Sequence, residues 1–297
     1  MPPTPRPLTL IVATTPIPTP TPTPTSTTES SSSSTTPIRL GIGHSGTLPW
    51  PRIKTDMSFF ARVTSRPPVP GTTNAIIMGR KTYDSVPAHL RPLAKRISTV
   101  ITRDVEGLKP RVAREVEERK AKLAASASAS AASTSGGNGN AVQPATDAIV
   151  CGGLDEALQE LETRYGEGKL GKVFVIGGAE IYGAVLAAKG GPVRIVMTNV
   201  EKKGYAEGDR GEVFECDTFF PVDEELFGEK EGWRRVTPEE VTEWVGEEVT
   251  GRWIEEGDVR VQMKLCARAY VDVYHGKVDT VLAESMYTAD MYSLDNN

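Results

Sequence analysis

The sequence predicts an α/β fold with a mostly parallel central sheet and helices on both faces. Short apolar runs rich in β-branched residues alternate with amphipathic segments along most of the chain. Two of these runs lead through glycine, Gly79 and Gly177-Gly178, directly into expected helices. Strands that alternate with helices are typical of parallel sheets with helices on both faces.

Each element follows from its local pattern. Asp56 opens a helix, since Asp56, Phe59, Phe60 and Val63 follow helical spacing. A second helix begins near Lys81, and Trp233, Trp244 and Trp253 are expected in loops and at the sheet edge. We expect strands at 8–13, 75–78, 98–102, 148–151, 172–176, 193–198 and 259–265, and further helices at 112–125, 154–165 and 179–189.

We expect one domain over residues 8–265, interrupted twice. Residues 18–37 are almost entirely Pro, Ser and Thr, which cannot bury enough apolar surface to fold. Thr-Thr-Pro-Ile occurs at 14–17 and again at 35–38, so we place a disordered insert at 14–34. Charged and then Ala/Ser/Gly-rich sequence predicts a surface excursion at 109–145, helical at first and then low in complexity. Residues 266–297 form a tail without a clear pattern.

The composition argues against several classes of protein. With 297 residues, 38% hydrophobic content and a net charge of −5, the chain lacks the basic excess of a nucleic-acid binder. Its three Cys and three His are scattered, which indicates neither a disulfide framework nor a metal site. No apolar run is long enough to span a membrane, and the N-terminus resembles no leader peptide. The scattered Cys indicate reduced thiols in a cytoplasmic setting. We also expect a monomer that acts on a small molecule.

Asp56 is the first candidate for chemistry. It lies on the apolar stripe of its helix, where burial raises the pKa of a carboxyl group and suits it to deliver a proton. A simple helix cap is the alternative for a lone Asp. The preceding Gly41-x-Gly43-x-x-Gly46 matches a dinucleotide fingerprint, but Pro49 and Pro51 follow where that fingerprint requires a helix. We interpret Gly41–Trp50 as a loop.

Three strand ends carry groups suited to phosphates. They are Gly79-Arg80-Lys81-Thr82, Thr102-Arg103-Asp104 and Gly177-Gly178-Ala179. Helix N-termini, arginine forks and paired glycines all favour anions, although each group alone could be an ordinary surface turn. Because the carboxyl ends of parallel strands share one edge of the sheet, the three together predict a dinucleotide with an additional phosphate, hence NADPH.

The motifs together resemble dihydrofolate reductase, of the fungal type with low-complexity insertions. They are Gly-Ile-Gly to Leu-Pro-Trp at 41–50, Asp56 before Phe59-Phe60, Met-Gly-Arg-Lys-Thr at 78–82, Arg-Pro-Leu at 91–93, Thr102-Arg103 and Ile-Gly-Gly to Tyr at 176–182, with Asp-Thr-Phe-Phe-Pro at 217–221 as a structural turn. The resemblance covers residues 8–13 and roughly 40–265. It implies a three-layer fold with a C-terminal antiparallel strand, and a cis bond between Gly177 and Gly178.

The resemblance also implies roles for individual residues. Asp56 would bind the pterin and promote its protonation, Thr198 would orient this carboxylate, and Arg96 would hold the glutamate carboxylate of the substrate. The implied catalytic set is Asp56, Thr198, Trp50 and Leu48. The implied substrate set is Ile11, Ala13, Asp56, Met57, Phe60, Val86, Leu90, Leu93, Arg96 and Thr198. The implied NADPH set is Ala13, Gly41, Ile42, Gly43, Gly46, Thr47, Arg80, Lys81, Thr82, Thr102, Arg103, Asp104, Gly177, Gly178, Ala179, Glu180, Ile181 and Tyr182.

The expected activity is NADPH-dependent reduction of 7,8-dihydrofolate to tetrahydrofolate, which supplies thymidylate and purine synthesis. Two alternatives stay open. One is a pyrimidine reductase of riboflavin synthesis with the same fold, although Arg96 would have no glutamate tail to bind there. The other is an NADPH or folate binder whose catalysis is impaired by the insert near the nicotinamide loop.

Overall fold

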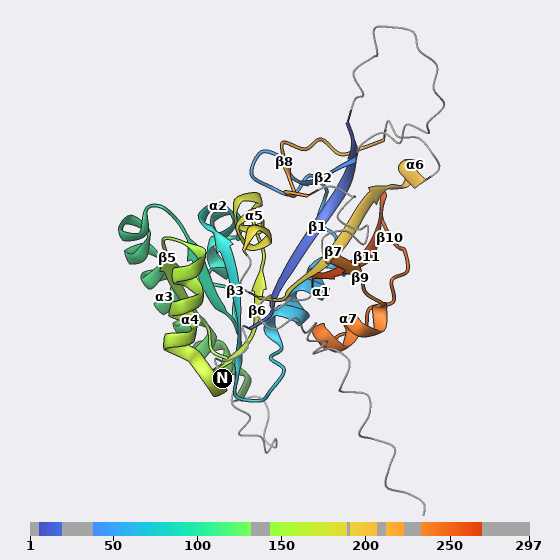
Figure 1. The fold of residues 1–297 in the computed structure, drawn as a ribbon. Helices are drawn as coiled ribbons and strands as arrows, with labels where there is room; N and C mark the ends of the chain where they lie inside the picture. Colours follow the sequence, from blue (N-terminus) through green and yellow to red (C-terminus); the bar gives the residue numbers. More distant parts are fainter. Residues whose placement is uncertain are drawn as a thin grey trace, which may run out of the picture.

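A computed structural model describes residues 6–19, 38–131, 143–188, 191–206, 212–222 and 233–268 (Figure 1). Its strands are β1 (Leu8–Pro18), β2 (Ile38–Gly43), β3 (Thr73–Gly79), β4 (Ile97–Ile101), β5 (Asp147–Cys151), β6 (Leu170–Val175), β7 (Val193–Lys202), β8 (Thr218–Phe219), β9 (Trp233–Arg235), β10 (Ile254–Glu256) and β11 (Val259–Arg268). Its helices are α1 (Lys54–Ser65), α2 (Arg80–Ser85), α3 (Val105–Ala131), α4 (Leu154–Lys169), α5 (Ala179–Ala187), α6 (Lys203–Ala206) and α7 (Pro238–Val245), with a 3-10 turn at Ala88–Leu90.

The central sheet has the strand order β10-β11-β7-β1-β6-β3-β4-β5. From β7 to β5 all neighbours are parallel, while β11 pairs antiparallel with β7 and β10 with β11. This confirms the predicted fold class, including the antiparallel strand at the C-terminal end. The first strand of the chain, β1, therefore lies between two strands from its second half, β6 and β7.

Helices cover both faces of the sheet, and each face has its own core (Figure 1). On one face, side chains of α4 and α5, such as Leu161 and Val185, pack with Leu10 of β1. On the other face, α1, α2, α3 and α7 pack with Ile11 of β1. The two neighbouring residues Leu10 and Ile11 enter different cores because side chains alternate along a strand. This alternation produces two separate apolar cores, one on each face of the sheet.

The expected insert boundary at residue 14 is wrong. Residues 14–18 continue β1 as a regular strand, and Thr14 and Thr15 are buried. Thr14 pairs with Asn199 of β7, and Thr15 to Pro18 pair antiparallel with β2. Ile17 lies opposite Arg39 and Pro18 opposite Ile38, so the first Thr-Thr-Pro-Ile copy lies in one strand of this antiparallel pair, and Ile38, the last residue of the second copy, begins the other. Residues 20–37, most of the expected insert, lie outside the described residues.

The segment after residue 109 is also more than a surface excursion. Helix α3 begins at Val105, and Leu108, Val112 and Val116 are buried against the sheet. These three residues recur every four positions and form the apolar stripe that the high charge of the segment obscured. Its low-complexity part at 132–142 lies outside the described residues.

The C-terminal half holds two further differences from expectation. Trp244 is buried in helix α7 rather than placed in a loop, whereas Trp233 lies buried in β9, a short strand that pairs only with β11, in agreement with an edge position. Strand β11 continues to Arg268, so the first residues of the expected tail pair with β7. The remainder of the tail, 269–297, falls outside the described part. Within the described residues, no helix is long and apolar enough to cross a membrane.

Candidate active site

Asp56 lies in the first turn of α1, between the helix and the carboxyl half of β7. The helix cap is Ile53, which offers no side-chain acceptor, so Asp56 is not the cap. Glu256 of β10 takes that role instead, because its carboxylate accepts the Lys54 N–H at 2.6 Å and the Thr55 N–H at 3.0 Å. Glu256 is distant from α1 in sequence, so no local sequence pattern predicted this contact. The Asp56 carboxyl group is therefore not needed to cap α1.

The environment of Asp56 favours its protonated form. Burial is the largest influence and raises the pKa of this carboxyl group. A hydrogen bond from the Thr198 hydroxyl lowers the pKa by less, and the charge of Glu256 raises it further. Thr198 is itself buried and lies opposite Ala13 of β1 in the parallel ladder. The structure therefore brings together Asp56, Thr198 and Ala13.

A cavity of about 150 Å³ adjoins Asp56 and Thr198. Its other walls come from α1, from β10 and β11, and from the segment after α7. The lining residues are Thr55, Phe59, Arg62, Glu248, Thr250, Gly251, Arg252, Ile254, Val261 and Met263. This volume is large enough for several water molecules, and its lining offers polar partners for them. Water can therefore reach the carboxyl group from this side.

The opposite end of α1 holds Arg96. This side chain is 8% exposed, and its Nη1 donates to the Thr64 hydroxyl at 2.7 Å while its Nε donates to the Ala94 carbonyl at 2.9 Å. Its guanidinium carbon lies 6.0 Å from the centre of the Phe60 ring. Asp56 and Thr64 are eight residues apart, which corresponds to about 12 Å along a helix. One helix therefore positions a carboxyl group and a guanidinium, with an aromatic ring between them.

Apolar side chains of the implied pocket meet beside that ring. Ile11 belongs to the core under α1, and Phe60 and Leu93 are half-buried against it. Met57 and Leu48 are 40% and 48% exposed, so neither is held by packing. Val86 and Leu90 follow α2 and end the 3-10 turn, both half-buried, and their contact with a substrate stays a prediction.

The segment Gly41–Trp50 is partly a strand, contrary to the expected loop. Gly41 and Gly43 end β2, where they pair with β8. Beyond them, Gly46 and Thr47 lie in an exposed tight turn closed by hydrogen bonds between His44 and Thr47. The backbone N–H of Ser45 donates to Asp217 at 2.6 Å, so the segment 217–221 anchors this turn through a short strand.

Trp50 is packed rather than presented to the site. It is buried at 5% exposure and meets Phe214 edge-on, with ring centres 6.0 Å apart. Its other neighbours in the cluster, Ile53, Val200 and Val259, are apolar. This placement favours a packing role, and a contact with a catalytic water stays a prediction.

The three expected phosphate-binding segments meet at one edge of the sheet. They follow β3, β4 and β6, which are neighbours and parallel. Gly79 donates its N–H to the Gly177 carbonyl at 2.8 Å, which joins two of the segments directly. Thr102 directly follows β4, whose last residue pairs with Gly79. Strand order alone has thus assembled groups that are far apart in sequence.

The two consecutive glycines leave open space at this edge. The Gly177–Gly178 peptide bond is cis, as the resemblance implied. A Cβ on Gly177 would lie 2.9 Å from the Tyr182 ring, and its φ of +106° also requires glycine. A Cβ on Gly178 would meet only the Thr82 hydroxyl, at 3.6 Å. The N-terminus of α5 has no side-chain cap, so its N–H groups face this space without a protein acceptor of that kind.

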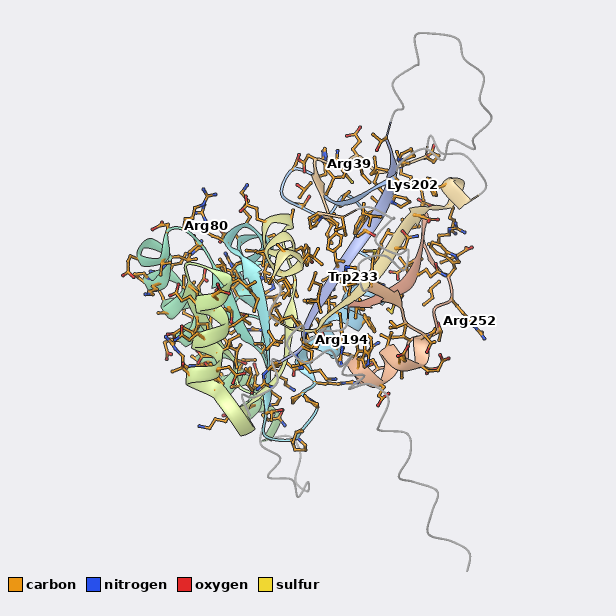
Figure 2. All side chains as sticks on the ribbon, in the orientation of Figure 1. Arg39, Arg80, Arg194, Lys202, Trp233 and Arg252 are labelled. Atoms are coloured by element: carbon orange, nitrogen blue, oxygen red, sulfur yellow. The ribbon has the colours of Figure 1, made fainter. Side chains whose placement is uncertain are left out.

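Three cations surround the same edge. Arg80, Lys81 and Arg103 are exposed, and none has a carboxylate within ion-pair distance among the described residues (Figure 2 labels Arg80). Asp104 is instead engaged with α3, since its carboxylate accepts the Gly107 N–H at 3.0 Å.

Tyr182 is buried and donates its hydroxyl to the Ile11 carbonyl at 2.7 Å. Ala179, Glu180 and Ile181 begin α5 beside Gly178.

Comparison with known proteins identifies the family. The sequence profile described as "Dihydrofolate reductase" matches residues 39–139. A dihydrofolate reductase of Heliothis virescens is 32% identical over 189 residues, which is 63% of this chain and 77% of that protein. One from Pneumocystis carinii is 30% identical over 239 residues, covering 77% of this chain and 91% of that protein. The chain belongs to the dihydrofolate reductase family.

A solved structure supports the fold independently. The dihydrofolate reductase of Schistosoma mansoni matches with a TM-score of 0.51 and 22% identity, over 88% of this chain and 98% of that one. This confirms the architecture. The fungal type stays a prediction, as do the roles of the individual site residues.

Proposed function

We propose that the protein reduces 7,8-dihydrofolate to 5,6,7,8-tetrahydrofolate with NADPH. The observation that carries the proposal is the pair of groups along α1, with Asp56 at one end and the Thr64-bound Arg96 at the other. A substrate with a polar ring at its head and a carboxylate at its tail matches this pair, because Asp56 and the Thr64 that holds Arg96 are about 12 Å apart along the axis of α1. Membership of the family supports the same substrate.

Asp56 binds the head of the substrate in this proposal. Its carboxyl group accepts hydrogen bonds from the amino and N3 groups of the pterin, and Thr198 keeps it in one orientation. Because burial raises its pKa, Asp56 takes up a proton more readily than an exposed carboxylate does. In this proposal a proton passes to the reacting N5 through a water, and the adjoining cavity gives solvent water access to Asp56 to restore the proton on its carboxyl group.

NADPH fits the edge beyond β3, β4 and β6. The open space at Gly178 admits a phosphate group next to the uncapped N-terminus of α5. Arg103, Arg80 and Lys81 have no acidic partners among the described residues, and Arg103 is suited to bind the additional phosphate of the adenosine ribose. When bound, the cofactor supplies the hydride that the pterin accepts at C6. The product would enter one-carbon metabolism, and we place the protein in the cytoplasm as a monomer.

A spectrophotometric assay tests this proposal. Purified protein is mixed with NADPH and 7,8-dihydrofolate, and the fall in NADPH absorbance is followed. Turnover that requires both components is the expected result. If the protein oxidises NADPH with the pyrimidine substrate of riboflavin synthesis instead, the related reductase is the correct assignment. Binding of both ligands without turnover identifies an impaired binder.

A further inference from the structure

Helix α1 is held at both ends by carboxylates of the segment 246–256, which follows α7. At the start of the helix, the carboxylate of Glu256 caps the first turn. At the other end, the carboxylate of Glu247 accepts a hydrogen bond from Nε of Arg62 at 2.8 Å, and its second oxygen pairs with Arg66. Between these two carboxylates, α1 faces the cavity of about 150 Å³.

Glu247 is a single carboxylate that neutralises two cations. Its side chain is 13% exposed, whereas those of Arg62 and Arg66 are 43% and 64% exposed. Among the described residues, neither arginine lies within ion-pair distance of another acid. Removing the charge of Glu247 would therefore leave two cations without a partner, and one of them, Arg62, lines the cavity.

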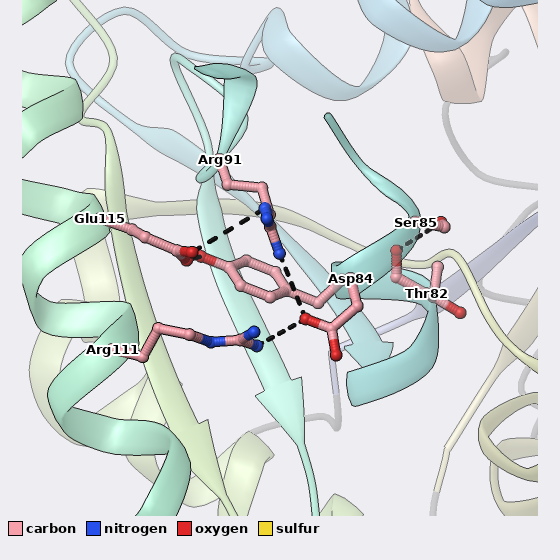
Figure 3. Close-up of polar contacts among 7 residues, drawn as sticks. Thr82, Asp84, Ser85, Arg91, Arg111 and Glu115 are labelled. Atoms are coloured by element: carbon pink, nitrogen blue, oxygen red, sulfur yellow. Dashed lines mark hydrogen bonds and ion pairs between the residues drawn. The ribbon is translucent and has the colours of Figure 1, made fainter. Parts of the chain in front are cut away.

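A second pair of arginines shows a different arrangement. Asp84 binds Arg91 at 3.2 Å and Arg111 at 2.5 Å (Figure 3). Glu115 adds another carboxylate to this cluster, and it lies 3.9 Å from Arg91. If one acid is lost there, another still lies beside the arginines. The pair of arginines on Glu247 has no second acid of this kind in the described part of the chain.

Arg62 and Asp56 line the same cavity but do not pair with each other. They are six residues apart on α1, which corresponds to about 9 Å along the helix axis. The long side chain of an arginine can cover much of this distance, and the cavity offers it room. Arg62 turns instead toward Glu247, to which its Nε donates. The carboxyl group of Asp56 keeps the hydroxyl of Thr198 as its hydrogen-bond partner.

The other charges around Asp56 do not replace that of Arg62. The segment after α7 contributes Glu248 and Arg252 to the lining of the cavity, and both are exposed and opposite in sign. Strand β10 contributes Glu256, whose negative charge raises the pKa of Asp56. The lining residues from β7 and β11 are uncharged. The position of Arg62 therefore decides which charge of α1 faces Asp56 across the cavity.

We propose that Glu247 is a positioning residue for the proton step of the reaction. By holding Arg62 at the far end of the cavity, Glu247 keeps Asp56 without a cationic partner and able to retain its proton. An opposite charge within about 4–6 Å lowers the pKa of a carboxyl group by roughly 1–3 units, so a released Arg62 would favour ionised Asp56. This role rests on the proposed function, in which Asp56 supplies the proton.

Titration of Asp56 tests this role without turnover. The carboxyl carbon of Asp56 is followed against pH by carbon-13 NMR in the ligand-free protein, and Asp56→Asn identifies its signal. Glu247→Ala should lower the pKa of Asp56 by about one unit, the lower end of the effect of a neighbouring cation. The double variant Glu247→Ala/Arg62→Gln should return to the wild-type value, because the released cation is no longer present.

Glu162→Ala is the matched control. It also removes a carboxylate that pairs with an arginine, since Glu162 of α4 lies 2.9 Å from Arg6 on the opposite face of the sheet. This variant should leave the titration of Asp56 unchanged. Glu247→Gln keeps the size of the side chain without its charge, so it should lower the pKa of Asp56 as well, and it replaces the Ala variant if that variant does not fold.

The pH profile of dihydrofolate reduction is the second measurement. In Glu247→Ala, the basic limb should move about one unit to lower pH, which lowers turnover on that limb about tenfold, while NADPH affinity stays unchanged. The profile of the double variant should again match that of the wild type.

Two results would overturn the role of Glu247. One is an unmoved titration of Asp56 in both Glu247 variants. The other is a shift that persists in the double variant, because the loss of Glu247 would then act through the fold and not through Arg62. If the titration shifts and recovers as expected but the protein does not reduce dihydrofolate, the proposed function fails, while the control of Arg62 by Glu247 stands.

Discussion

The hydroxyl of Thr198 on β7 donates a hydrogen bond to the carboxyl group of Asp56 on α1. This bond favours the ionised form, but burial outweighs it, so the pKa of Asp56 lies above its ordinary value. Thr198 thus fixes where the carboxyl group points without making it a stronger acid than usual. A carboxyl group with a defined neighbour and a raised pKa suits the proton-donor role that we propose for Asp56.

Replacing Asp56 with Asn should lower the turnover of dihydrofolate by roughly 10²–10⁴-fold at neutral pH, the usual contribution of an acid–base group. NADPH binding should not change, because Asp56 lies away from the Gly177–Gly178 edge. Steady-state kinetics and NADPH titration measure the two effects. Near-normal turnover in this variant would remove Asp56 from the proposed chemistry.

The same substitution should not destabilise the protein at neutral pH. Because the folded state raises the pKa of Asp56, it binds the proton more tightly than the unfolded chain, whose value is near 3.8. Stability from this group is therefore present at low pH and is lost as pH rises toward the folded pKa. Because Asn carries no charge to bury, the melting temperature of the Asp56→Asn variant at neutral pH should equal or exceed that of the wild type. A large fall would indicate that Asp56 mainly supports the fold.

Changing Glu256 to Gln should shift the pH profile of the reductase. The charge of Glu256 raises the pKa of Asp56, so its removal lowers that pKa and moves the basic limb of the activity profile to lower pH. Gln keeps one acceptor oxygen, so it can still accept from one of the two N–H groups, those of Lys54 and Thr55, that the carboxylate of Glu256 accepts from. Glu256→Ala is the companion variant, which should produce the same shift together with a lower melting temperature. An unmoved profile in both would show that the two carboxyl groups do not interact.

The sequence predicted the parallel core because each strand there carries its own signal. Runs such as Ala75–Met78 and Lys172–Ile176 are apolar whatever surrounds them, and glycine marks the start of the next helix. Thr14–Pro18 gave no such signal, since its composition equals that of the following low-complexity segment. Its strand forms through pairing with β7 and β2, which local pattern does not reveal. In α3, charged residues hid an apolar stripe that only the sheet beneath it makes important.

In the site, too, residues with a local sequence signal could be predicted, and residues placed by contacts between distant elements could not. Asp56, Arg103 and Gly177-Gly178 could be selected because their motifs are local. Glu256 could not, since it reaches the N-terminus of α1 from an element distant in sequence. The environment of Arg96 was also hidden, because its buried side chain is held by Thr64 of α1, an element distant in sequence.

Arg103→Ala should weaken NADPH by ten- to a hundredfold and leave NADH almost unaffected. The expected loss is that of a charge-assisted contact with the additional phosphate, about 1.5–3 kcal/mol. Lys122→Ala is a suitable control, because Lys122 is an exposed cation of α3 away from this edge. Dissociation constants for both cofactors give the ratio. If NADPH and NADH weaken equally, Arg103 does not distinguish them.

Arg96→Leu should raise the KM for dihydrofolate while NADPH affinity stays unchanged. The variant also removes a buried cation without an acidic partner among the described residues, so its melting temperature should not fall greatly. Added folate should then stabilise the wild type more than the variant, because only the wild type gains a counter-ion on binding. The KM for a substrate without the glutamate tail should be the same in the variant and the wild type. Equal damage to that truncated substrate would mean that Arg96 shapes the pocket without contacting the tail.

Two deletions should separate the strand from the segment that follows it. Removing residues 20–34 keeps β1, β2 and their four paired positions from Thr15 to Pro18. Loop-closure entropy changes by only about 0.6 kcal/mol per doubling of length, so the melting temperature should change by a few degrees at most. Turnover should be equal or higher, since the turn at 44–47 follows β2 directly.

Removing residues 14–34 has a different expected result. The copy Thr35-Thr36 then follows Ala13, so identical threonines can occupy the buried positions of Thr14 and Thr15 beside β7. The antiparallel pairs Ile17–Arg39 and Pro18–Ile38 are lost, because only one copy of Thr-Thr-Pro-Ile remains to form them. The longer deletion should therefore fold but melt below the shorter one. If both melt together, the pairing between β1 and β2 contributes nothing to stability, and if both melt far below the intact chain, residues 20–34 themselves pack on the domain.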